Sequence, residues 1–210
     1  MPPFSPLAGV KGWRPSPRAM AALAIALLGA TLVGQAAYIH AKAILAQILL
    51  DRAFAATIAS GTETKPWSWA DTWPVARIAV PRLSASAIAL AGSSGQALAF
   101  GPGHVEGTAE PGDPGTAVYA AHRDTHFAFL QRVVVGDIVE VTGSAGAINR
   151  YRVTRLSVAP WKRADIDPAA AGRHLVLATC WPFDARTPGP LRYLVHADLV
   201  EPETGPADQI

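Results

Sequence analysis

One stretch near the start of the chain limits what it can fold into more than any other. Residues 19–39 contain no charged residue and no proline. As an α-helix, a segment of that length rises about 31 Å, which matches a membrane hydrocarbon core of ~30 Å. The stretch therefore predicts a membrane-spanning helix, with a cleaved signal peptide as the alternative. We favour an uncleaved anchor, because the run is long for a signal peptide and a helix-compatible sequence follows it.

The charges before this run predict its orientation. Lys11, Arg14 and Arg18 lie within residues 1–18, which contain no acidic residue. The positive-inside rule therefore places residues 1–18 in the cytoplasm as a basic tail and the body of the protein outside it. We expect a single-pass protein of the inner (plasma) membrane, with the lipid bilayer as a partner and the following domain in the periplasm.

The remaining charges exclude one class of partner. Of the 18 basic residues, 15 follow the basic tail, and they are balanced by 16 acidic residues. A domain that binds nucleic acid usually carries a basic patch and a high net positive charge. The balance in this body indicates no nucleic-acid partner.

Residues 40–74 link the predicted span to the rest of the chain. Residues 40–60 contain no proline, and apolar residues recur there at helical spacing, at Ile44, Leu45, Ile48 and Leu49. This juxtamembrane helix either lies on the membrane or the domain, or continues the anchor as an exposed stalk. The linker that follows contains three indoles, at Trp67, Trp69 and Trp73. Because an exposed indole leaves a large apolar face in water, we expect the domain, the membrane interface or both to cover them.

From residue 75 onward the chain changes to short β-prone runs that are separated by turn residues. The expected strands are residues 75–80, 85–90, 115–121, 137–141, 150–158, 174–179 and 191–199. Residues 124–132 are expected to form a short helix, and residues 202–210 a disordered tail. Seven or eight strands at this spacing favour a closed barrel or a sandwich over βαβ units. Half of the residues are hydrophobic, so residues 75–201 can form one mainly β domain.

The only cysteine, Cys180, lies at the end of an apolar run and before a Trp-Pro turn. A single cysteine forms no internal disulfide, so it is a buried filler, an intermolecular bridge, a metal ligand or a nucleophile. His122 and His126 directly follow another predicted strand, and an imidazole can activate a thiol. Arg192 stands on the polar face of the last predicted strand, where a cation can stabilise an oxyanion. The set is compatible with acyl transfer at an amide.

These motifs resemble those of the sortases, the membrane-anchored cysteine transpeptidases. Leu177-Ala-Thr-Cys180 resembles their Leu-x-Thr-Cys signature, Ala121-His122 resembles their histidine motif, and Arg192 occupies the place of their arginine. The likeness runs from about residue 73 to residue 201. Further details are most similar to the class GN branch of marine Gram-negative bacteria: Asp71-Thr-Trp-Pro-Val-Ala-Arg77, Phe100-Gly-Pro-Gly-His104, His122-Arg-Asp-Thr-His126-Phe127 and Cys180-Trp-Pro-Phe183.

The resemblance implies an eight-stranded sortase β-barrel and a reaction. It implies that Cys180 cleaves a C-terminal sorting signal of an exported protein through a thioacyl-enzyme, and that the acyl group passes to an amine. His122 and Arg192 are the implied catalytic partners, and Thr179 is implied as a supporting or substrate-contacting hydroxyl. For this chain we expect no cofactor and no metal. This sequence departs from the pattern at Ala121, where a glycine often stands, and has a second arginine nearby, Arg186, that competes for the role of Arg192.

Other functions remain open. His122 and His126 could bind a metal with Cys180, although no Cys-x-x-Cys pair supports this. An L,D-transpeptidase also uses cysteine and histidine, but its motifs lie close together, whereas 58 positions separate His122 from Cys180 here. A membrane-anchored, non-enzymatic binding or assembly module is the third alternative. The segment before residue 75 also resembles the lids of pilin-assembling sortases, so Trp73 either covers the site or anchors the domain at the membrane interface.

Overall fold

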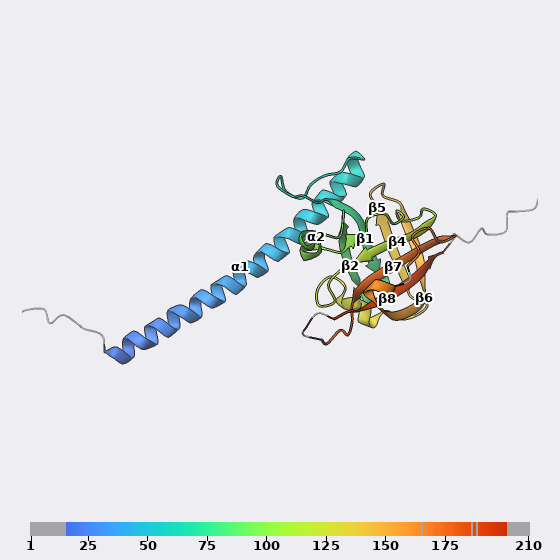
Figure 1. The fold of residues 1–210 in the computed structure, drawn as a ribbon. Helices are drawn as coiled ribbons and strands as arrows, with labels where there is room; N and C mark the ends of the chain where they lie inside the picture. The colour runs from blue at the N-terminus through green and yellow to red at the C-terminus, as the bar shows by residue number, and fades with distance from the viewer. Residues whose placement is uncertain (1–15, 165, 186, 188, 201–210) are drawn as a thin grey trace, which may run out of the picture. The chain divides into compact units, whose positions relative to one another are not determined.

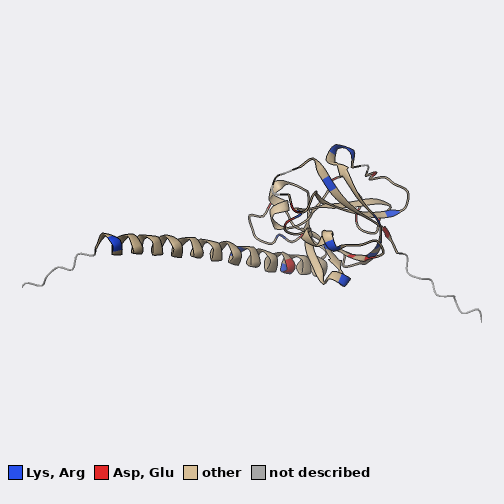
Figure 2. Cartoon of the chain, turned by 90° about the horizontal axis from the view of Figure 1, so that it is seen from below, with Lys and Arg blue, Asp and Glu red and all other residues tan. Residues whose placement is uncertain are grey.

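A computed structural model describes residues 16–164, 166–185, 187 and 189–200 of the chain. Its contacts divide the chain after Ile44 into two compact units, which are described separately. The first unit contributes the start of helix α1 (Pro17–Ser60), and every described residue up to Ile44 is exposed. Figure 2 shows the long uncharged ribbon between Arg18 and Lys42. Within the described residues, α1 is the one helix that is long and apolar enough to cross a membrane.

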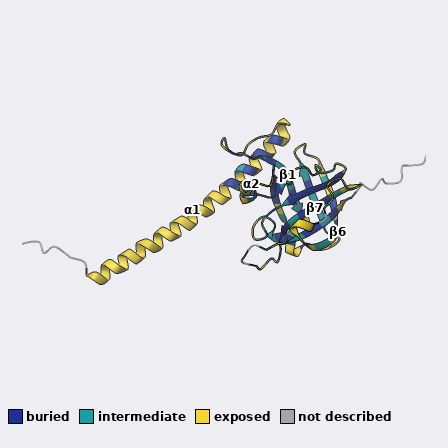
Figure 3. Cartoon of the chain, in the orientation of Figure 1, coloured by how far each residue is buried: buried dark blue, intermediate teal, exposed yellow. Residues whose placement is uncertain are grey.

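In the second unit, the end of α1 packs on the barrel. Its buried residues recur every three or four positions and form one face of the helix (Figure 3): Ala46, Leu50, Ala53, Phe54 and Thr57. Leu50 and Phe54 pack with Ile88, Leu90 and Ala97 of the domain. Residues 45–60 therefore dock on the domain and do not form an exposed stalk. The buried face differs from the apolar positions noted in the sequence, since Ile44, Leu45 and Ile48 remain exposed.

Two polar contacts supplement this docking. Gln47 donates a 2.9 Å hydrogen bond to the carbonyl of Phe100, and Arg77 forms a 2.8 Å ion pair with Asp51. Both ends of the ion pair are about half exposed, so apolar burial stabilises the contact more than charge does.

Eight strands close into a barrel, as the sequence predicts (Figure 1). They are β1 (Pro74–Val80), β2 (Ala85–Leu90), β3 (Gly103–His104), β4 (Gly115–Ala120), β5 (Ile138–Gly143), β6 (Ile148–Pro160), β7 (Arg173–Cys180) and β8 (Leu191–Leu199). Their order around the barrel is β1-β2-β3-β4-β7-β8-β6-β5. Strand β7 runs parallel to β4 and antiparallel to β8. Strand β3 was not predicted, because two residues are too short for an alternating pattern.

The helical predictions for the domain are only partly correct. Residues 124–132 form a 3-10 helix only over Ala128–Arg132 (η2). A short helix that the sequence did not indicate, α2 (Gly95–Phe100), begins after Ser94, whose side chain accepts from the main-chain N–H of Ala97. Two further 3-10 turns follow strands: η1 (Pro81–Leu83) and η3 (Trp161–Arg163).

The barrel interior is built from alternate residues of its strands. Along β1 the buried residues are Pro74, Ala76, Ile78 and Val80, with half-buried residues between them. This period of two follows from the pleat of an extended strand, which turns successive side chains to opposite faces. Each large aliphatic side chain buried in this way contributes about 1.5–3 kcal/mol relative to its exposed state.

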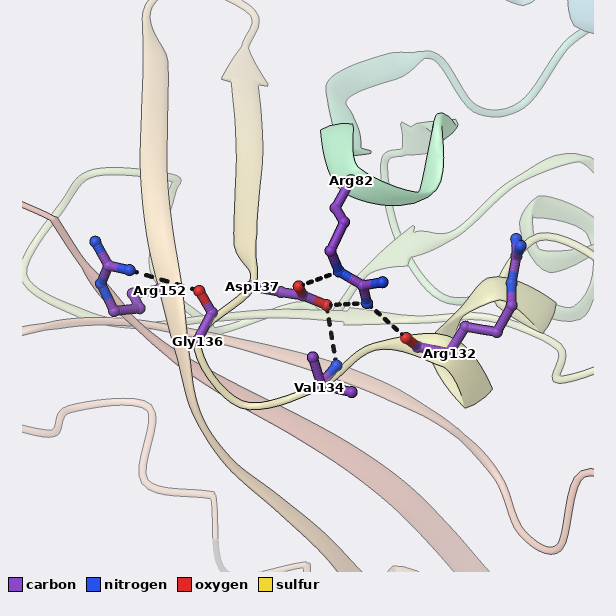
Figure 4. Close-up of polar contacts among 6 residues, drawn as sticks. All are labelled: Arg82, Arg132, Val134, Gly136, Asp137 and Arg152. Carbon is purple, nitrogen blue, oxygen red and sulfur yellow. Dashed lines mark hydrogen bonds and ion pairs between the residues drawn. The ribbon is translucent and has the colours of Figure 1, made fainter.

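A buried carboxylate joins three elements at the end of β1 (Figure 4). Asp137 accepts from Arg82 through both carboxylate oxygens, with 2.7 Å between Arg82 Nη2 and Oδ2, and also from the N–H of Val134 at 2.9 Å. Arg82 Nη2 donates in turn to the carbonyl of Arg132 at 2.7 Å. The Arg82 hydrogen bond holds the pKa of Asp137 below its ordinary value, because it stabilises the carboxylate.

Candidate active site

Three neighbouring strands bring the predicted catalytic side chains together. Cys180 is the last residue of β7, and its cross-strand partner on β8 is Arg192. On the other side of β7, Ala120 of β4 pairs with Ala178, and the N–H of Ala121 donates to the carbonyl of Ala178 at 3.1 Å. His122 follows two residues after this last ladder pair, as Cys180 follows two residues after Ala178. Cys180 and Arg192 are therefore cross-strand neighbours, and His122 lies just beyond the end of the adjacent strand β4.

The three residues also share the outer face of the barrel. Leu175, Leu177 and Thr179 are buried, so the alternate residues of β7, including Cys180, point outward. On β8 the same alternation places Val195 inside and Arg192 outside. Cys180 is half-buried, whereas His122 is exposed. A substrate can therefore reach the thiol from the surface.

An apolar cluster lies on the same outer face as Cys180. Val118, Val176 and Leu194 form a buried cluster on β4, β7 and β8. Ala164 and Ile166, from the segment between β6 and β7, pack against this cluster. Leu194 therefore shares the face of Arg192, so the outer face of β8 is not wholly polar.

The side chain of Thr179 makes an interior contact. Its side chain is 2% exposed, and its hydroxyl donates a 2.8 Å hydrogen bond to the carbonyl of Ala121. A side chain that points into the barrel cannot reach a peptide bound on the outer face. Strand alternation turns Thr179 away from the side that carries Cys180, which favours the supporting alternative, and the assignment of this hydroxyl stays a prediction.

Both arginines near the cysteine hold the loop between β7 and β8. Arg192 Nη1 donates to the carbonyls of Gly189 and Leu191, each at 2.9 Å. Arg123 Nη2 donates to the carbonyl of Ala185 and, at 3.1 Å, to that of Thr187. Sequence analysis missed Arg123, because nothing in its spacing shows that it reaches a loop more than 60 positions away. Arg186, the competing arginine, lies outside the described residues.

An aromatic cluster fixes the turn that follows Cys180. The rings of Trp181 and Tyr193 stack with centroids 5.6 Å apart, and Phe183 meets Tyr193 edge-on at 5.2 Å. Phe183 and Tyr193 also pack against the barrel core. The N–H of Trp181 donates to the carbonyl of Leu191 at 3.1 Å, so this turn and the start of β8 are joined beside the thiol.

The other histidines make local contacts. Burial lowers the pKa of His126, opposed by a hydrogen bond to the main chain of Ala99, with a smaller effect from the neighbouring His122. His174 is joined to Asp198 by 2.7 Å between Nδ1 and Oδ1, and a hydrogen bond to the carbonyl of Ala171 raises its pKa most. Among the residues that the structure describes, no three His, Cys, Asp or Glu side chains are grouped to bind a metal ion.

The tryptophan linker is only partly covered. Trp67 packs edge-on against Phe100 at 5.1 Å, whereas Trp69 is 83% exposed. Trp73 is half-buried, and its carbonyl accepts from Ala91 at the end of β2. Trp73 directly precedes β1, which lies four strands from β7 in either direction around the barrel. Successive ladder pairs nevertheless join the start of β1 to the ends of β4 and β7, so Trp73 lies at the same end of the barrel as Cys180 and a lid stays a prediction.

Comparisons with known proteins agree with this architecture. A family model described as the sortase domain matches residues 78–200. Sortase D of Bacillus subtilis (strain 168) is 25% identical over 122 residues, which cover 58% of this chain and 61% of that protein. The chain thus spans less than two thirds of the length of this curated relative.

Solved structures give the same result. Sortase A from Corynebacterium diphtheriae matches with a TM-score of 0.58 and 26% identity, over 67% of this chain and 66% of that one. A Clostridium perfringens sortase D5 transpeptidase matches with a TM-score of 0.60 over 75% of this chain and 99% of that one. At 20% identity, the second likeness shows the fold alone. The family match covers more than half of the chain and includes the strands that carry Cys180 and Arg192, so this chain belongs to the sortase family.

Proposed function

We propose that this protein is a membrane-anchored cysteine transpeptidase. It cleaves a C-terminal sorting signal of an exported protein through a thioacyl-enzyme and transfers the acyl group to an amine. The observation that supports the proposal is the cross-strand pair of Cys180 and Arg192, with His122 two residues beyond the Ala120–Ala178 pair on the other side of β7. Family membership supports the same chemistry.

The first half-reaction makes the thioester. The Cys180 thiolate adds to the carbonyl carbon of the scissile peptide bond, and the resulting oxyanion accepts a hydrogen bond from the Arg192 guanidinium. The C–N bond then breaks, and the leaving amine takes a proton from protonated His122. The products of this half are the thioacyl-enzyme, neutral His122 and the released C-terminal peptide.

The second half-reaction reverses these roles. An acceptor amine adds to the thioester carbonyl and gives its proton to His122. The C–S bond breaks, and the new amide leaves with the acyl group. Cys180 returns as a thiolate and His122 as an imidazolium, so the cycle consumes no other reactant.

The surroundings of the thiol suit an extended peptide substrate. The apolar cluster of Val118, Val176 and Leu194 lies on the same face as Cys180. Because Ala164 and Ile166 already cover this cluster, a peptide with apolar side chains can pack against the covering segment while its carbonyl approaches the thiol. We infer that the sorting signal binds along this outer face.

The anchor places this chemistry on exported proteins. Helix α1 is long and apolar enough to span, and Lys11, Arg14 and Arg18 precede the apolar stretch. These charges favour a cytoplasmic N-terminus and a periplasmic domain on the inner membrane. The Cys180-Trp-Pro-Phe183 motif supports assignment to the class GN branch.

The test uses the full-length protein in detergent. The probes are C-terminal segments of exported proteins encoded by neighbouring genes, with hydroxylamine as the acceptor. We expect a mass increase on Cys180 that hydroxylamine releases, absent from Cys180→Ala and strongly reduced in His122→Ala. A folded protein that forms no thioester with any segment, and whose Cys180 resists iodoacetamide at neutral pH, would be a non-enzymatic module.

A further inference from the structure

The part of the chain that returns from the β7–β8 loop into β8, here called the returning limb (residues 185–191), presents main-chain carbonyls to two arginines. The carbonyls of Ala185 and Thr187 accept from Arg123, and those of Gly189 and Leu191 accept from Arg192. One stretch of main chain therefore connects the two guanidinium groups.

The two arginines approach this limb from opposite sides of Cys180. Arg123 directly follows His122, three residues after the end of β4, whereas Arg192 is the second residue of β8. Because β7 lies between β4 and β8, the limb is held on both sides of the strand that ends in the thiol. Movement of the limb would change the position of the Arg192 guanidinium relative to Cys180.

Arg123 holds two carbonyls of the returning limb with one side chain. Its Nη1 is shielded from solvent and has no hydrogen-bond partner among the described residues, whereas the contact of Nη2 with Thr187 is exposed, so the guanidinium is only partly enclosed. One nitrogen, Nη2, makes both carbonyl contacts, and the planar guanidinium holds it in a fixed orientation, whereas a lysine ammonium lies on a flexible stem. Shielding from water strengthens the hydrogen bonds of a charged donor. It also raises the free-energy cost of losing those hydrogen bonds.

We propose that Arg123 is a positioning residue for the transpeptidation: it holds the returning limb of the β7–β8 loop and, through that limb, the Arg192 guanidinium beside Cys180. This inference rests on the proposed function for its kinetic consequence. Arg123 itself touches neither the substrate nor the reacting atoms. Its loss lowers the fraction of time in which Arg192 is placed to stabilise the oxyanion.

A double-mutant cycle tests this indirect role. The turnover of a peptide that the wild type cleaves is measured for Arg123→Ala, Arg192→Ala and the double variant. We expect Arg123→Ala to lower kcat by about 10-fold with less effect on KM, because residues that share a partner are energetically coupled. In the Arg192→Ala background, the same change should cost less than about 3-fold. Full additivity of the two losses would overturn the proposal.

Two further variants separate positioning from a general loss of structure. Arg123→Lys should recover only part of kcat: an ammonium can also donate to two carbonyls, as Nη2 does here, but it lies on a shorter and more flexible side chain. Arg152→Ala is the matched control: Arg152 also donates to a carbonyl, that of Gly136 (Figure 4), but its strand partner is Asp198, at the far end of β8 from Arg192. Its kcat should equal that of the wild type. A loss in Arg152→Ala as large as in Arg123→Ala would refute a specific role.

A second readout does not depend on turnover. In Arg123→Ala, the amides of Trp181 and Ala185, which donate within this loop, should exchange hydrogen faster, while the core strands remain protected. Alkylation of Cys180 by iodoacetamide, which forms no oxyanion, should keep the wild-type rate. If the wild type cleaves no peptide, the proposed function fails. Independently, unchanged hydrogen exchange of the loop amides in Arg123→Ala would refute the positioning role of Arg123.

Discussion

The hydroxyl of Thr179 donates a 2.8 Å hydrogen bond to the carbonyl of Ala121, and each of these residues directly precedes a proposed reacting side chain. Cys180 follows the threonine on β7, and His122 follows the alanine after β4. The bond continues the pairing of the two strands beyond the last ladder pair, Ala120 with Ala178. It therefore fixes the separation of thiol and imidazole from inside the barrel.

Replacement of this hydroxyl should lower activity. Thr179→Val keeps the shape of the side chain but leaves the buried Ala121 carbonyl without its donor, which costs roughly 1–3 kcal/mol of stability. We expect kcat for a cleaved peptide to fall by about 10-fold, since small displacements of catalytic groups have large effects on rate. Thr179→Ser retains the donor and should stay close to the wild type. Equal activity of the wild type and both variants would show that the Thr179 hydroxyl does not contribute to catalysis.

The two arginines of the β7–β8 region should differ in importance. Arg192→Ala removes the proposed oxyanion donor and should lower kcat by roughly 100-fold or more. Arg192→Lys keeps the charge but loses the planar fork, so it should recover little. Arg186→Ala should lower kcat only slightly. Steady-state kinetics on one peptide would rank them, and the reverse order would move the assignment to Arg186.

The docked end of α1 should be part of the folded domain. Phe54 is 2% exposed and packs with Leu50 against the domain. Phe54→Ala should destabilise the domain by about 3–5 kcal/mol. Ile48→Ala changes a residue on the exposed side of the same helix and is the matched control. Equal urea midpoints for the two variants in a protein that begins at residue 45 would show that the packing contributes nothing.

The Asp137 cluster should make stability depend on pH in the acid range. Because Arg82 holds the folded-state pKa of Asp137 below its unfolded value of about 3.9, the stabilisation is fully present above that value. It is lost as the pH falls through the folded-state pKa. Asp137→Asn should therefore lower Tm at pH 7, and the difference from the wild type should narrow below about pH 4. A difference that is constant from pH 7 to pH 3 would contradict this.

The proposed topology can be measured in cells. Because three basic residues precede the apolar stretch, alkaline phosphatase fused after residue 200 should be active outside the cytoplasm. Replacement of Lys11, Arg14 and Arg18 by glutamate should reduce that activity, since it removes the positive charge that orients the helix. A silent phosphatase, with a cytoplasmic reporter active at the same junction, would reverse the orientation.

Local patterns were sufficient for much of the fold. The spans of β2 and β8 match the expected ranges 85–90 and 191–199. Strand β8 shows the alternation of a strand with one buried face, whereas β2 is a short apolar run between turn residues. The uncharged stretch likewise predicts a long helix at residues 19–39, as found within α1. Strand β3 and helix α2 were missed, since a few residues carry too little periodicity to be recognised.

For the site, the sequence determined which residues have the chemistry, and the tertiary structure decided where each one lies. A thiol, imidazoles and arginines can be read from the chain, and the family motifs single out Cys180, His122 and Arg192. Their proximity requires β7 to pair in parallel with β4 across the intervening β5 and β6, and no local pattern specifies such a non-local pairing. The same register turns Thr179 inward and brings Arg123 to Ala185, because contacts between distant segments depend on how the closed barrel packs.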